Sequence, residues 1–591
     1  IYVYCLIRTL SSLVLKKISN ILMSFNFSYR KLGFLEQLYT SVEDSSLGTY
    51  DTQLYSPIAD RFLVLNQSNV NNTTFNHKWA IRHSPKVTQN VIEGAELEDN
   101  NGNVVKRDVF IKISPLCDPV KYARGKTDEP IELFSQLPQL QDSTKGCSYS
   151  KDVNNVPYVD SFFSYLSSQM LNHHGMVHGV DYYGSILGKQ KEYVYEAIDE
   201  LDLLEESDYF RKHLGKLFKL DEEVENHLFN NRSLSNKPAI QIDECETLLD
   251  NVESIEVTDI EGEIINADNT ITQPLTEHNI QLLQGNTLEE EDIHISTDGE
   301  ESEYCSSRSS DTLNETESMS SGDMVTESSS DYDPDMSALL TVFDYPVQLS
   351  FLERCTDTLD TLLSDEDIEL SEKELESAIL QILFTLVIYQ KCFAFTHNDL
   401  HSNNIMFVKT ERPNLYYKFD NKHYKVPTYG RIFKIIDFGR AIYRFRGNII
   451  CSNSFAPTGD AGGQYNCEPF LQEDKPRLDP NYSFDLCRLG TSMYDYFVED
   501  CGKEDQEEWW DIIKVILSWC KDDKNRNVLY KSNGEERYPN FKLYKMITRT
   551  VHDHKPTKVL TQKIWEKYIV GRKSINKAQR IMNIDTLPSY V

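Results

Sequence analysis

The stretch that decides the fold prediction reads THNDLHSNNIMF (Thr396–Phe407), then a polar interval, then RIFKIIDFGRA (Arg431–Ala441). An apolar run of helical period precedes the first motif, so Asp399 and Asn404 fall on a loop between a predicted helix and the strand-like run IMFV. Asp437 follows the apolar run IFKII, which predicts a buried strand, and the glycine two residues later lets the backbone turn sharply. We therefore expect the two carboxylates and the amide to meet in one site.

Those residue types fit phosphoryl transfer from ATP, which needs metal ligands, a cation on the phosphates and a base beside the attacking hydroxyl. Asp399 is the candidate base, and Asn404 and Asp437 offer the oxygen ligands that Mg²⁺ prefers. The candidate cation is Lys112 in the strand-like run VFIK. Each motif alone is a common structural feature, but their order, with a helix before one and a strand before the other, favours the functional interpretation.

The same motifs resemble those of the eukaryotic-type protein kinase superfamily. HNDLHSNN is similar to the catalytic loop H-R-D-L-K-x-x-N, IIDFGRA to the metal-binding D-F-G strand, and SFDLCRLG to the helix whose Asp braces the catalytic loop. The resemblance covers roughly Trp79 to Asp500, with an acidic segment as an insertion. The long polar inserts are similar to serine/threonine protein kinases of large nucleocytoplasmic DNA viruses.

The resemblance implies an α+β, bilobal protein-kinase-like fold, with a β-rich N-terminal lobe, a mainly helical C-terminal lobe and a long acidic disordered insertion. It implies Mg²⁺ and ATP as cofactors, Asp399 as catalytic base, Asn404 and Asp437 as metal ligands and Lys112 as the phosphate-binding lysine. LERC (Leu352–Cys355) would be the hinge that contacts adenine. The remaining residues implied are Phe351, Glu353 and Cys355 at the nucleotide, and His397, Asp485 and Asp160 as support of the site.

The nucleotide-binding half departs from the family pattern. No G-x-G-x-x-G precedes Lys112, and the nearest glycines are Gly94 and Gly102. A flexible loop of backbone N–H groups around the phosphates is therefore not predicted.

Lys112 also lacks the usual helix glutamate. A lysine inside an apolar strand needs an anionic partner, but the helix predicted over Tyr158–Leu171 carries no Glu. Asp160, Glu129 and Glu132 are the candidate substitutes, and we favour Asp160. The alternative is that Lys112 is an edge-strand lysine whose amine reaches solvent.

Two departures from the kinase catalytic-loop motif bear on regulation and on the class of molecule that accepts the phosphate. Asn398 replaces the Arg of H-R-D, which implies a site that phosphorylation of the activation segment does not switch. His401 replaces the expected Lys, and D-L-H-x-x-N is similar to aminoglycoside and choline kinase types and to haspin-like kinases. The nearest counterpart of A-P-E is CEPF (Cys467–Phe470).

We expect a serine/threonine protein kinase that phosphorylates a protein hydroxyl. A small-molecule phosphotransferase is the alternative within the same chemistry. A pseudokinase-type binding scaffold is the alternative from another class: the missing glycine loop and helix Glu favour it, whereas the retained base and metal ligands oppose it.

The composition of this 591-residue chain limits the kinds of binding partner and the cellular location that we expect. A formal net charge of −33 argues against nucleic acid as a partner, because a polyanion is repelled except at a local basic patch. The 12 cysteines include no C-x-x-C pair, which predicts reduced thiols in a cytoplasmic location, either host cytoplasm or virion if the viral resemblance holds. We expect no membrane partner and no structural metal.

Five segments are predicted. Residues 1–22 are apolar but interrupted by cations, and we interpret them as non-native sequence upstream of Met23. Residues 23–221 are expected to form an N-terminal extension and most of the N-lobe. Residues 336–570 are expected to form the end of the N-lobe, the hinge and the C-lobe. Residues 222–335 are an acidic, Ser-rich, largely disordered insertion; we favour a plain linker, and the alternative is a phosphorylation substrate of this same chain. Residues 571–591 are a basic tail. Its segment KSINKAQR is interpreted as a solvated helix face, and the alternative is a docking site for an acidic partner or for the chain's own acidic insertion.

Local patterns predict individual elements. DRFLVLN (60–66) and KWAIRH (78–83) are typical of strands, as are VHGVDYYGSIL and KEYVYEAID, and Asn100–Asn103 predicts a hairpin turn before the strand of Lys112. A helix is predicted over Ser371–Cys392 with a Ser371/Glu374 capping box, and further helices over 481–500 and 509–520. An inserted hairpin is expected in YYKFDNKHYKVPTYG. His173, His174 and His178 are interpreted as a surface loop rather than a metal site.

Overall fold

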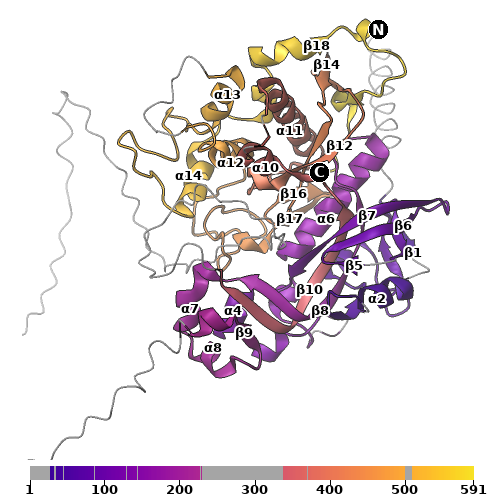
Figure 1. The fold of residues 1–591 in the computed structure, drawn as a ribbon, viewed down its shortest axis with the longest axis vertical. Helices are drawn as coiled ribbons and strands as arrows, with labels where there is room; N and C mark the ends of the chain where they lie inside the picture. Colours follow the sequence, from indigo (N-terminus) through magenta and orange to yellow (C-terminus); the bar gives the residue numbers. More distant parts are fainter. Residues whose placement is uncertain are drawn as a thin grey trace, which may run out of the picture. The chain divides into compact units, whose positions relative to one another are not determined.

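The computed structural model describes residues 27–228, 337–498 and 509–591, apart from gaps at 32–34, 44, 85–86, 128, 141, 143, 227, 366 and 369. This part of the chain is a mixed α+β structure with a sheet-rich part and a helical part (Figure 1). Residues 1–22 and nearly all of the acidic insertion lie outside the described residues, so the expectations for them are not addressed. The first residues of that insertion form helix α9 (Glu222–Glu225).

The sheet-rich part is built on one eight-stranded antiparallel sheet. Its strand order is β2-β8-β10-β7-β6-β4, with β5 paired to β6 and β9 to β10. The Asn100–Asn103 turn prediction is confirmed, because β6 and β7 form a hairpin that closes there. The strands are β2 (Thr49–Gln53), β4 (Ala80–His83), β5 (Val87–Thr88), β6 (Val91–Glu98), β7 (Val104–Pro115), β8 (Tyr182–Glu196), β9 (Phe218–Leu220) and β10 (Leu339–Glu353).

Two strand predictions in this part need correction. DRFLVLN is not a strand: helix α3 (Pro57–Phe62) covers its start, because Ser56 accepts a hydrogen bond from the Ala59 N–H and Pro57 occupies the first turn. The two strands predicted between 177 and 199 are one continuous strand, β8. A small ribbon of β1 (Tyr29–Lys31) and β3 (Thr73–Phe75) and helix α2 (Leu35–Glu43) complete the N-terminal region.

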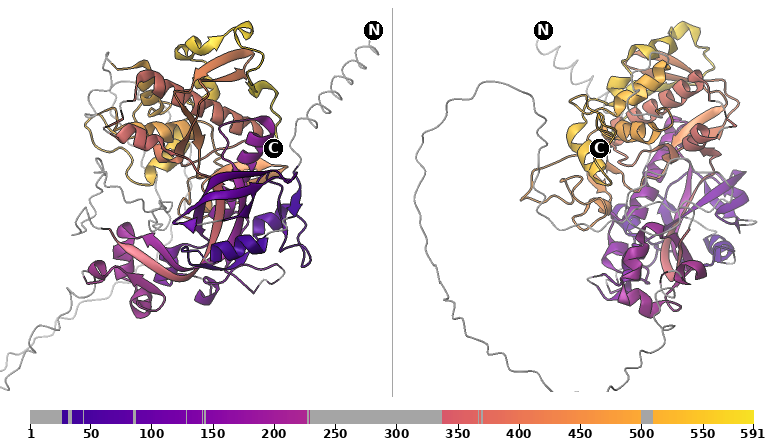
Figure 2. Two further views of the ribbon diagram at one scale, coloured as in Figure 1. Left: turned by 45° about the vertical axis from the view of Figure 1, so that its right-hand side comes forward. Right: turned by 60° about the vertical axis from the view of Figure 1, so that its left-hand side comes forward.

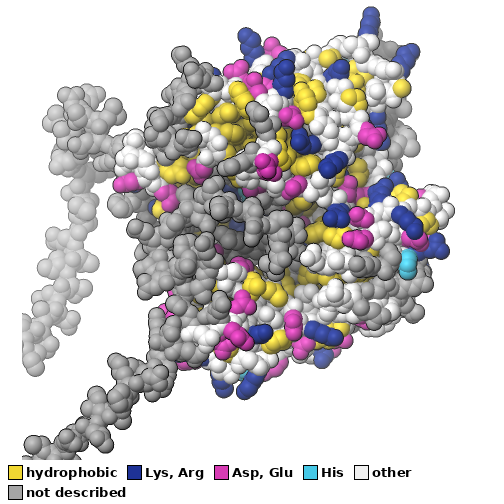
Figure 3. Space-filling view, in the orientation of Figure 1, with side chains coloured by type: hydrophobic (Ala, Val, Ile, Leu, Met, Phe, Trp, Pro, Cys, Tyr) yellow, Lys and Arg dark blue, Asp and Glu magenta, His cyan; other side chains and the backbone are white. Residues whose placement is uncertain are grey.

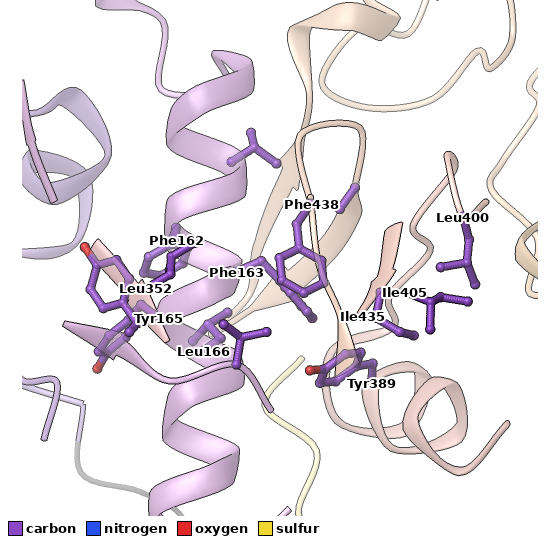
Figure 4. Close-up of a cluster of buried hydrophobic side chains, with 14 of the residues drawn as sticks. Phe162, Phe163, Tyr165, Leu166, Leu352, Tyr389, Leu400, Ile405, Ile435 and Phe438 are labelled. Atoms are coloured by element: carbon purple, nitrogen blue, oxygen red, sulfur yellow. The ribbon is translucent and has the colours of Figure 1, made fainter. Parts of the chain in front are cut away.

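Helix α6 (Val156–Gln169) is the element that connects the two parts. Figure 4 shows Phe163 pointing from α6 toward Phe438, while Phe162 and Tyr165 lie toward Leu352 on the sheet side. The ring centroids of Phe163 and Phe438 are 4.7 Å apart. The helix predicted over 158–171 is thus confirmed in type, and its last turn widens into a π-helical turn, Met170–His174. Burial on both faces explains why this helix is apolar or small nearly all round.

The helical part is organised around α11 (Glu372–Phe393), which is confirmed as predicted. The Glu374 carboxylate accepts hydrogen bonds from the Ser371 N–H and hydroxyl, which closes the predicted capping box. Among the described helices, α11 alone is long and apolar enough to cross a bilayer, but 94% of its most apolar window is buried inside the protein. Its neighbours are α10 (Leu359–Ser364), α12 (Phe484–Met493), α13 (Asp511–Trp519), α14 (Lys542–Thr550) and α15 (Pro556–Val559).

Short strands position the loops of the helical part. β11 (Asp357–Thr358), β12 (Ile405–Lys409) and β15 (Arg431–Ile435) form one sheet, and β16 (Ile442–Phe445) pairs with β17 (Asn448–Cys451). The inserted hairpin is confirmed as β13 (Asn414–Phe419) and β14 (Lys422–Pro427). It is flanked by β18 (Ile569–Val570) and β19 (Met582–Asn583). KSINKAQR (573–580) is exposed as expected, apart from Ile575, but its only helical turn is the 3-10 turn Arg572–Ser574. The tail beyond it is packed, since β19 pairs with β13 and Tyr590 stacks on Phe393.

The histidine prediction is wrong for His178. Its side chain is fully buried, with Nδ1 2.7 Å from the Phe433 carbonyl oxygen and Nε2 2.7 Å from the Tyr417 hydroxyl. It joins the sheet-rich part to β15 and the inserted hairpin, and burial lowers its pKa to about 4, which keeps it neutral.

Smaller helices border the sheet. Figure 1 labels α4, α7 and α8 close to β9 at one end of the sheet, and Figure 2 shows this part of the molecule from two further directions. These three helices are α4 (Pro119–Arg124), α7 (Leu201–Glu205) and α8 (Asp208–His213), and a further small helix is α5 (Ser148–Lys151). On the face drawn in Figure 3, lysine and arginine side chains are interspersed with aspartate and glutamate, so the described surface of this face has no large patch of one sign.

Candidate functional site

Lys112 lies between two carboxylates. Its Nζ is 2.9 Å from Asp160 Oδ2 and 3.0 Å from Asp437 Oδ1, and all three side chains are largely buried. Burial alone would lower the pKa of Lys112, but the two carboxylates outweigh it and raise that pKa. Lys112 in turn holds the pKa of Asp437 well below its usual range against the effect of burial. The amine is therefore charged and fixed beside Asp437. Glu129 instead accepts a hydrogen bond from the Ser148 N–H.

Asp160 also fixes the backbone of the D-F-G turn. Its Oδ1 accepts a hydrogen bond of 2.7 Å from the Phe438 N–H. Asp437 adopts φ 58°, in the left-handed region, and its carboxylate accepts the Gly439 N–H at 3.3 Å. A Cβ on Gly439 would lie 2.9 Å from Val156 Cγ1, so a side chain there would push against α6. Helix α6 thus contacts both Lys112 and the backbone next to Asp437 through Asp160.

Asp485, on α12, fastens the loop that carries Asp399. Its buried carboxylate accepts the N–H groups of His397 and Asn398, each at 2.9 Å. His397 donates from Nε2 to the Ile436 carbonyl at 2.9 Å and accepts the Asp399 N–H at Nδ1. These bonds define a neutral tautomer of His397 and join the loop to the strand before Asp437.

Asn398 makes neutral bridges where the kinase resemblance has an arginine. It adopts φ 66°, a conformation that asparagine tolerates. Its amide donates to the Arg440 carbonyl at 2.8 Å, and its oxygen accepts the Tyr465 hydroxyl at 2.7 Å. The residue therefore ties the catalytic loop to the segment after the D-F-G motif without adding charge.

Asp399 is surrounded by groups that stabilise its ionised form. The Tyr544 hydroxyl donates to Oδ1 at 2.9 Å, and Arg488 Nε lies 3.8 Å from the same oxygen. Burial raises the pKa of this carboxyl, but Arg440 and Arg488 outweigh it, so the net shift of the pKa is downward. Asp399 is thus ionised at neutral pH and able to accept a proton.

Three of these neighbours were missed from the sequence. Arg440 directly follows the D-F-G motif and Arg488 lies in SFDLCRLG, so both stood inside quoted motifs. Tyr544 comes 145 residues after Asp399, and no local pattern connects them.

Asn404 is oriented by its two donor hydrogens. Its Nδ2 donates to the Asp399 carbonyl at 2.9 Å and to His401 Nε2 at 3.0 Å. The amide oxygen is then directed away from these partners, which suits a metal ligand. No cluster of three or more His, Cys, Asp or Glu placed to hold a metal occurs in the described residues. Asn404 and Asp437 carry the oxygen atoms that could hold a Mg²⁺ ion here.

This arrangement makes His401 a source of pH dependence. Burial, with Arg488 nearby, lowers the pKa of His401 to about 4 from an ordinary value of 6.5. Between those values the unfolded chain binds a proton that the folded chain does not, so the free energy of unfolding falls as the pH falls through this window. The slope from this group is at most about 1.4 kcal/mol per pH unit.

We expect His401→Gln to flatten this dependence, because Gln still accepts the Asn404 hydrogen bond but does not titrate. The measurement is the denaturant-derived free energy of unfolding at several pH values from 7 to 4.5 for both proteins. Equal slopes in the two proteins would contradict the assignment. The comparison is needed because other buried histidines, such as His77 and His178, also have lowered pKa values.

Four of the expected site residues line one cavity, which Asn404 does not line, and the expected hinge residues lie elsewhere. A cavity of roughly 220 Å³ is lined by Lys112, Asp160, Asp399 and Asp437. Glu353 and Cys355 line a second, more open cavity of roughly 880 Å³. Phe351 is fully buried in β10.

Glu353 has its own buried partners at the end of β10. Its carboxylate binds Lys434 Nζ at 2.7 Å and accepts the Asp181 N–H at 3.1 Å. In this arrangement the Glu353 side chain links the end of β10 to β15 and to Asp181, the residue before β8.

Comparison with known proteins gives a limited result. No protein-family model matches the chain. A probable serine/threonine-protein kinase of Dictyostelium discoideum is 31% identical over 102 residues, which are 16% of this chain and 8% of that protein. The chain thus matches a small fraction of that relative's length. The similarity supports a kinase-like relationship and, with it, an enzyme.

Proposed function

We propose that this chain is an Mg²⁺- and ATP-dependent phosphotransferase, and more narrowly a serine/threonine protein kinase. The observation that carries the proposal is the contact of Lys112 with both Asp160 and Asp437, in the cavity that Asp399 also lines. Four groups from four distant segments meet there, and they are the cation, the base and the carboxylates that phosphoryl transfer needs.

Each residue would have a distinct role. Lys112 would bind phosphate oxygens, and Asp160 would hold the lysine in place. Asp399 would orient the acceptor hydroxyl and take its proton. Asn404 and Asp437 would hold Mg²⁺, which supplies neutralisation of the charge on the transferred group.

The order of the elements supports a bilobal protein-kinase-like fold. An antiparallel sheet carries Lys112 on β7, helix α6 follows and supplies Asp160, and the chain returns to the sheet as β8 and β10. It then continues into the helical part, where α11 leads to Asp399 and α12 supplies Asp485. The further likeness to kinases of large DNA viruses rests on sequence features alone.

The residues expected around the nucleotide favour a pseudokinase-type binding scaffold as the second candidate function. The hairpin of β5 and β6 turns at Gln89 and Asn90 with no glycine, and the Asn90 carbonyl accepts the Ile111 N–H at 2.7 Å. Its backbone is thus tied to β7 rather than free to close over phosphates. The 220 Å³ cavity is also smaller than the roughly 300–1,000 Å³ of most ligand pockets, so nucleotide binding would require it to widen.

One experiment separates the candidates. The protein is incubated with γ-labelled ATP and either Mg²⁺ or EDTA, with dephosphorylated casein as protein acceptor or with a panel of aminoglycosides and choline. We expect Mg²⁺-dependent label on casein that Asp399→Ala abolishes. Label on a small acceptor alone would assign a small-molecule kinase. ATP binding without any transfer would assign the scaffold, and neither binding nor transfer would reject all three.

A further inference from the structure

The Tyr544 hydroxyl is already in contact with the proposed base. It donates a hydrogen bond of 2.9 Å to Asp399 Oδ1, the carboxylate oxygen proposed to take the acceptor's proton. Arg488 Nε donates to the same hydroxyl oxygen at 2.8 Å. A hydroxyl that attacks a phosphoryl group must first lie within hydrogen-bond distance of the general base. Tyr544 already meets this condition.

The side chain is held there by its own helix and by two arginines. The Arg488 and Arg440 guanidinium carbons lie 5.3 Å and 5.9 Å from the Tyr544 ring centroid. On α14 the ring stacks on Phe541 at 5.4 Å, and Phe484 of α12 lies 6.1 Å away. The position of the hydroxyl is thus determined by packing on several sides rather than by one surface contact.

The chemistry of the hydroxyl fits an acceptor that needs a base. Burial raises the pKa of Tyr544, so the phenol keeps its proton at neutral pH. The Asp399 carboxylate is in contact with that proton.

We propose that Tyr544 is an intramolecular phosphate acceptor, phosphorylated by this chain's own site. The inference rests on the proposed function and adds a modification site to it. Tyr544 Oη forms a bond to the γ-phosphorus of ATP while the bond from that phosphorus to the β,γ-bridging oxygen breaks, and ADP leaves. Asp399 takes the phenol proton and passes it to solvent. A phosphotyrosine at this place would have Arg488 and Arg440 beside it, and both are suited to bind a phosphate.

The test follows phosphorylation by site and by rate. Phosphatase-treated protein is incubated with Mg²⁺-ATP and casein, and modified peptides are identified by mass spectrometry. We expect up to one phosphate per chain at Tyr544, with a rate constant unchanged over a hundredfold range of protein concentration. Tyr544→Phe removes this signal, whereas Tyr538→Phe, which changes a partly exposed tyrosine six residues earlier, leaves it unchanged.

A mixing experiment distinguishes the two proposals. Asp399→Asn protein of altered mass is incubated with the wild type, and its Tyr544 is expected to stay unmodified, because the transfer occurs within one chain. Modified casein with unmodified Tyr544 would overturn the inference and leave the proposed function in place. Phosphorylation of Tyr544 at a rate proportional to protein concentration would also overturn it. No phosphorylation of either acceptor would overturn both.

Discussion

Replacing Asp437 by asparagine is expected to lower kcat for phosphoryl transfer by about 10³-fold. The variant exchanges a negatively charged metal ligand for a neutral amide, and a metal ion in such a site supplies several kcal/mol of charge stabilisation. A loss of about 4 kcal/mol corresponds to this factor. The variant also deprives Lys112 of one of its two carboxylates, although the contact with Asp160 at 2.9 Å remains.

The fold should survive this change. Asparagine is among the residues that adopt the left-handed φ of 58° found at Asp437, and Lys112 keeps an ionised partner. The measurements are kcat from γ-phosphate transfer, Mg²⁺ affinity by calorimetry and the thermal unfolding midpoint. Asp474→Asn, in an exposed loop, is the matched control and should leave all three unchanged. A kcat within tenfold of the wild type would show that Asp437 is not a metal ligand.

The positions of Asp399, Asn404 and Asp437 were predictable because these residues sit in short motifs. Asp399, Asn404 and Asp437 each follow an element whose apolar pattern is strong, so sequence position determines where the side chain emerges. Asp160 was favoured over Glu129 and Glu132 for Lys112, and the structure places Asp160 there. Asp160 also accepts a hydrogen bond from the Phe438 N–H. This second contact was not predictable from sequence spacing, because it depends on how closely α6 packs against the D-F-G turn.

The surroundings of Asp399 were not predictable, because they also depend on contacts between segments that are far apart in the sequence. Tyr544 reaches the carboxylate from a helix 145 residues away, and this contact exists only once α12 and α14 pack together. A tyrosine in an amphipathic helix looks the same whether it packs in a core or touches a base. The ion pair of Glu353 with Lys434 was not predictable either, because β10 and β15 belong to different sheets and are brought together only in the folded chain.

For the helices and strands, the prediction was correct where the capping residues and the apolar pattern indicated the same element, and wrong where they did not. Ser371 and Glu374 mark the start of α11 and an apolar pattern continues from them, so cap and periodicity gave one answer. The strand predicted over 60–66 rested on the apolar run FLVL alone and left out Ser56 and Pro57 just before it, which start helix α3. His178 resembled a loop residue because its two partners, Phe433 and Tyr417, are more than 200 residues away.

Phe163→Ala is expected to destabilise the protein more than any surface substitution, by about 3–5 kcal/mol. The side chain is fully buried on α6, and its ring centroid lies 4.3 Å from that of Phe395 and 4.8 Å from that of Tyr443. Removing it leaves a cavity between α6 and the helical part, where the rings around it are themselves packed and cannot collapse fully. The measurement is the free energy of unfolding from a denaturant titration, with an unchanged m-value as the check that the same transition is compared.

The same substitution should affect the site, because Phe163 lies one helical turn from Asp160 and packs on Phe438, the neighbour of Asp437. A looser α6 would let the Lys112 and Asp437 pair separate, so the kcat of the folded fraction should fall as well. Phe163→Leu fills most of the cavity and should recover part of both losses. Val64→Ala, at a side chain that is 90% exposed, should change stability by less than about 0.5 kcal/mol. A cost below about 1 kcal/mol for Phe163→Ala would mean that α6 is held by the sheet alone, and its contact with the helical part would then contribute little to the geometry of the site.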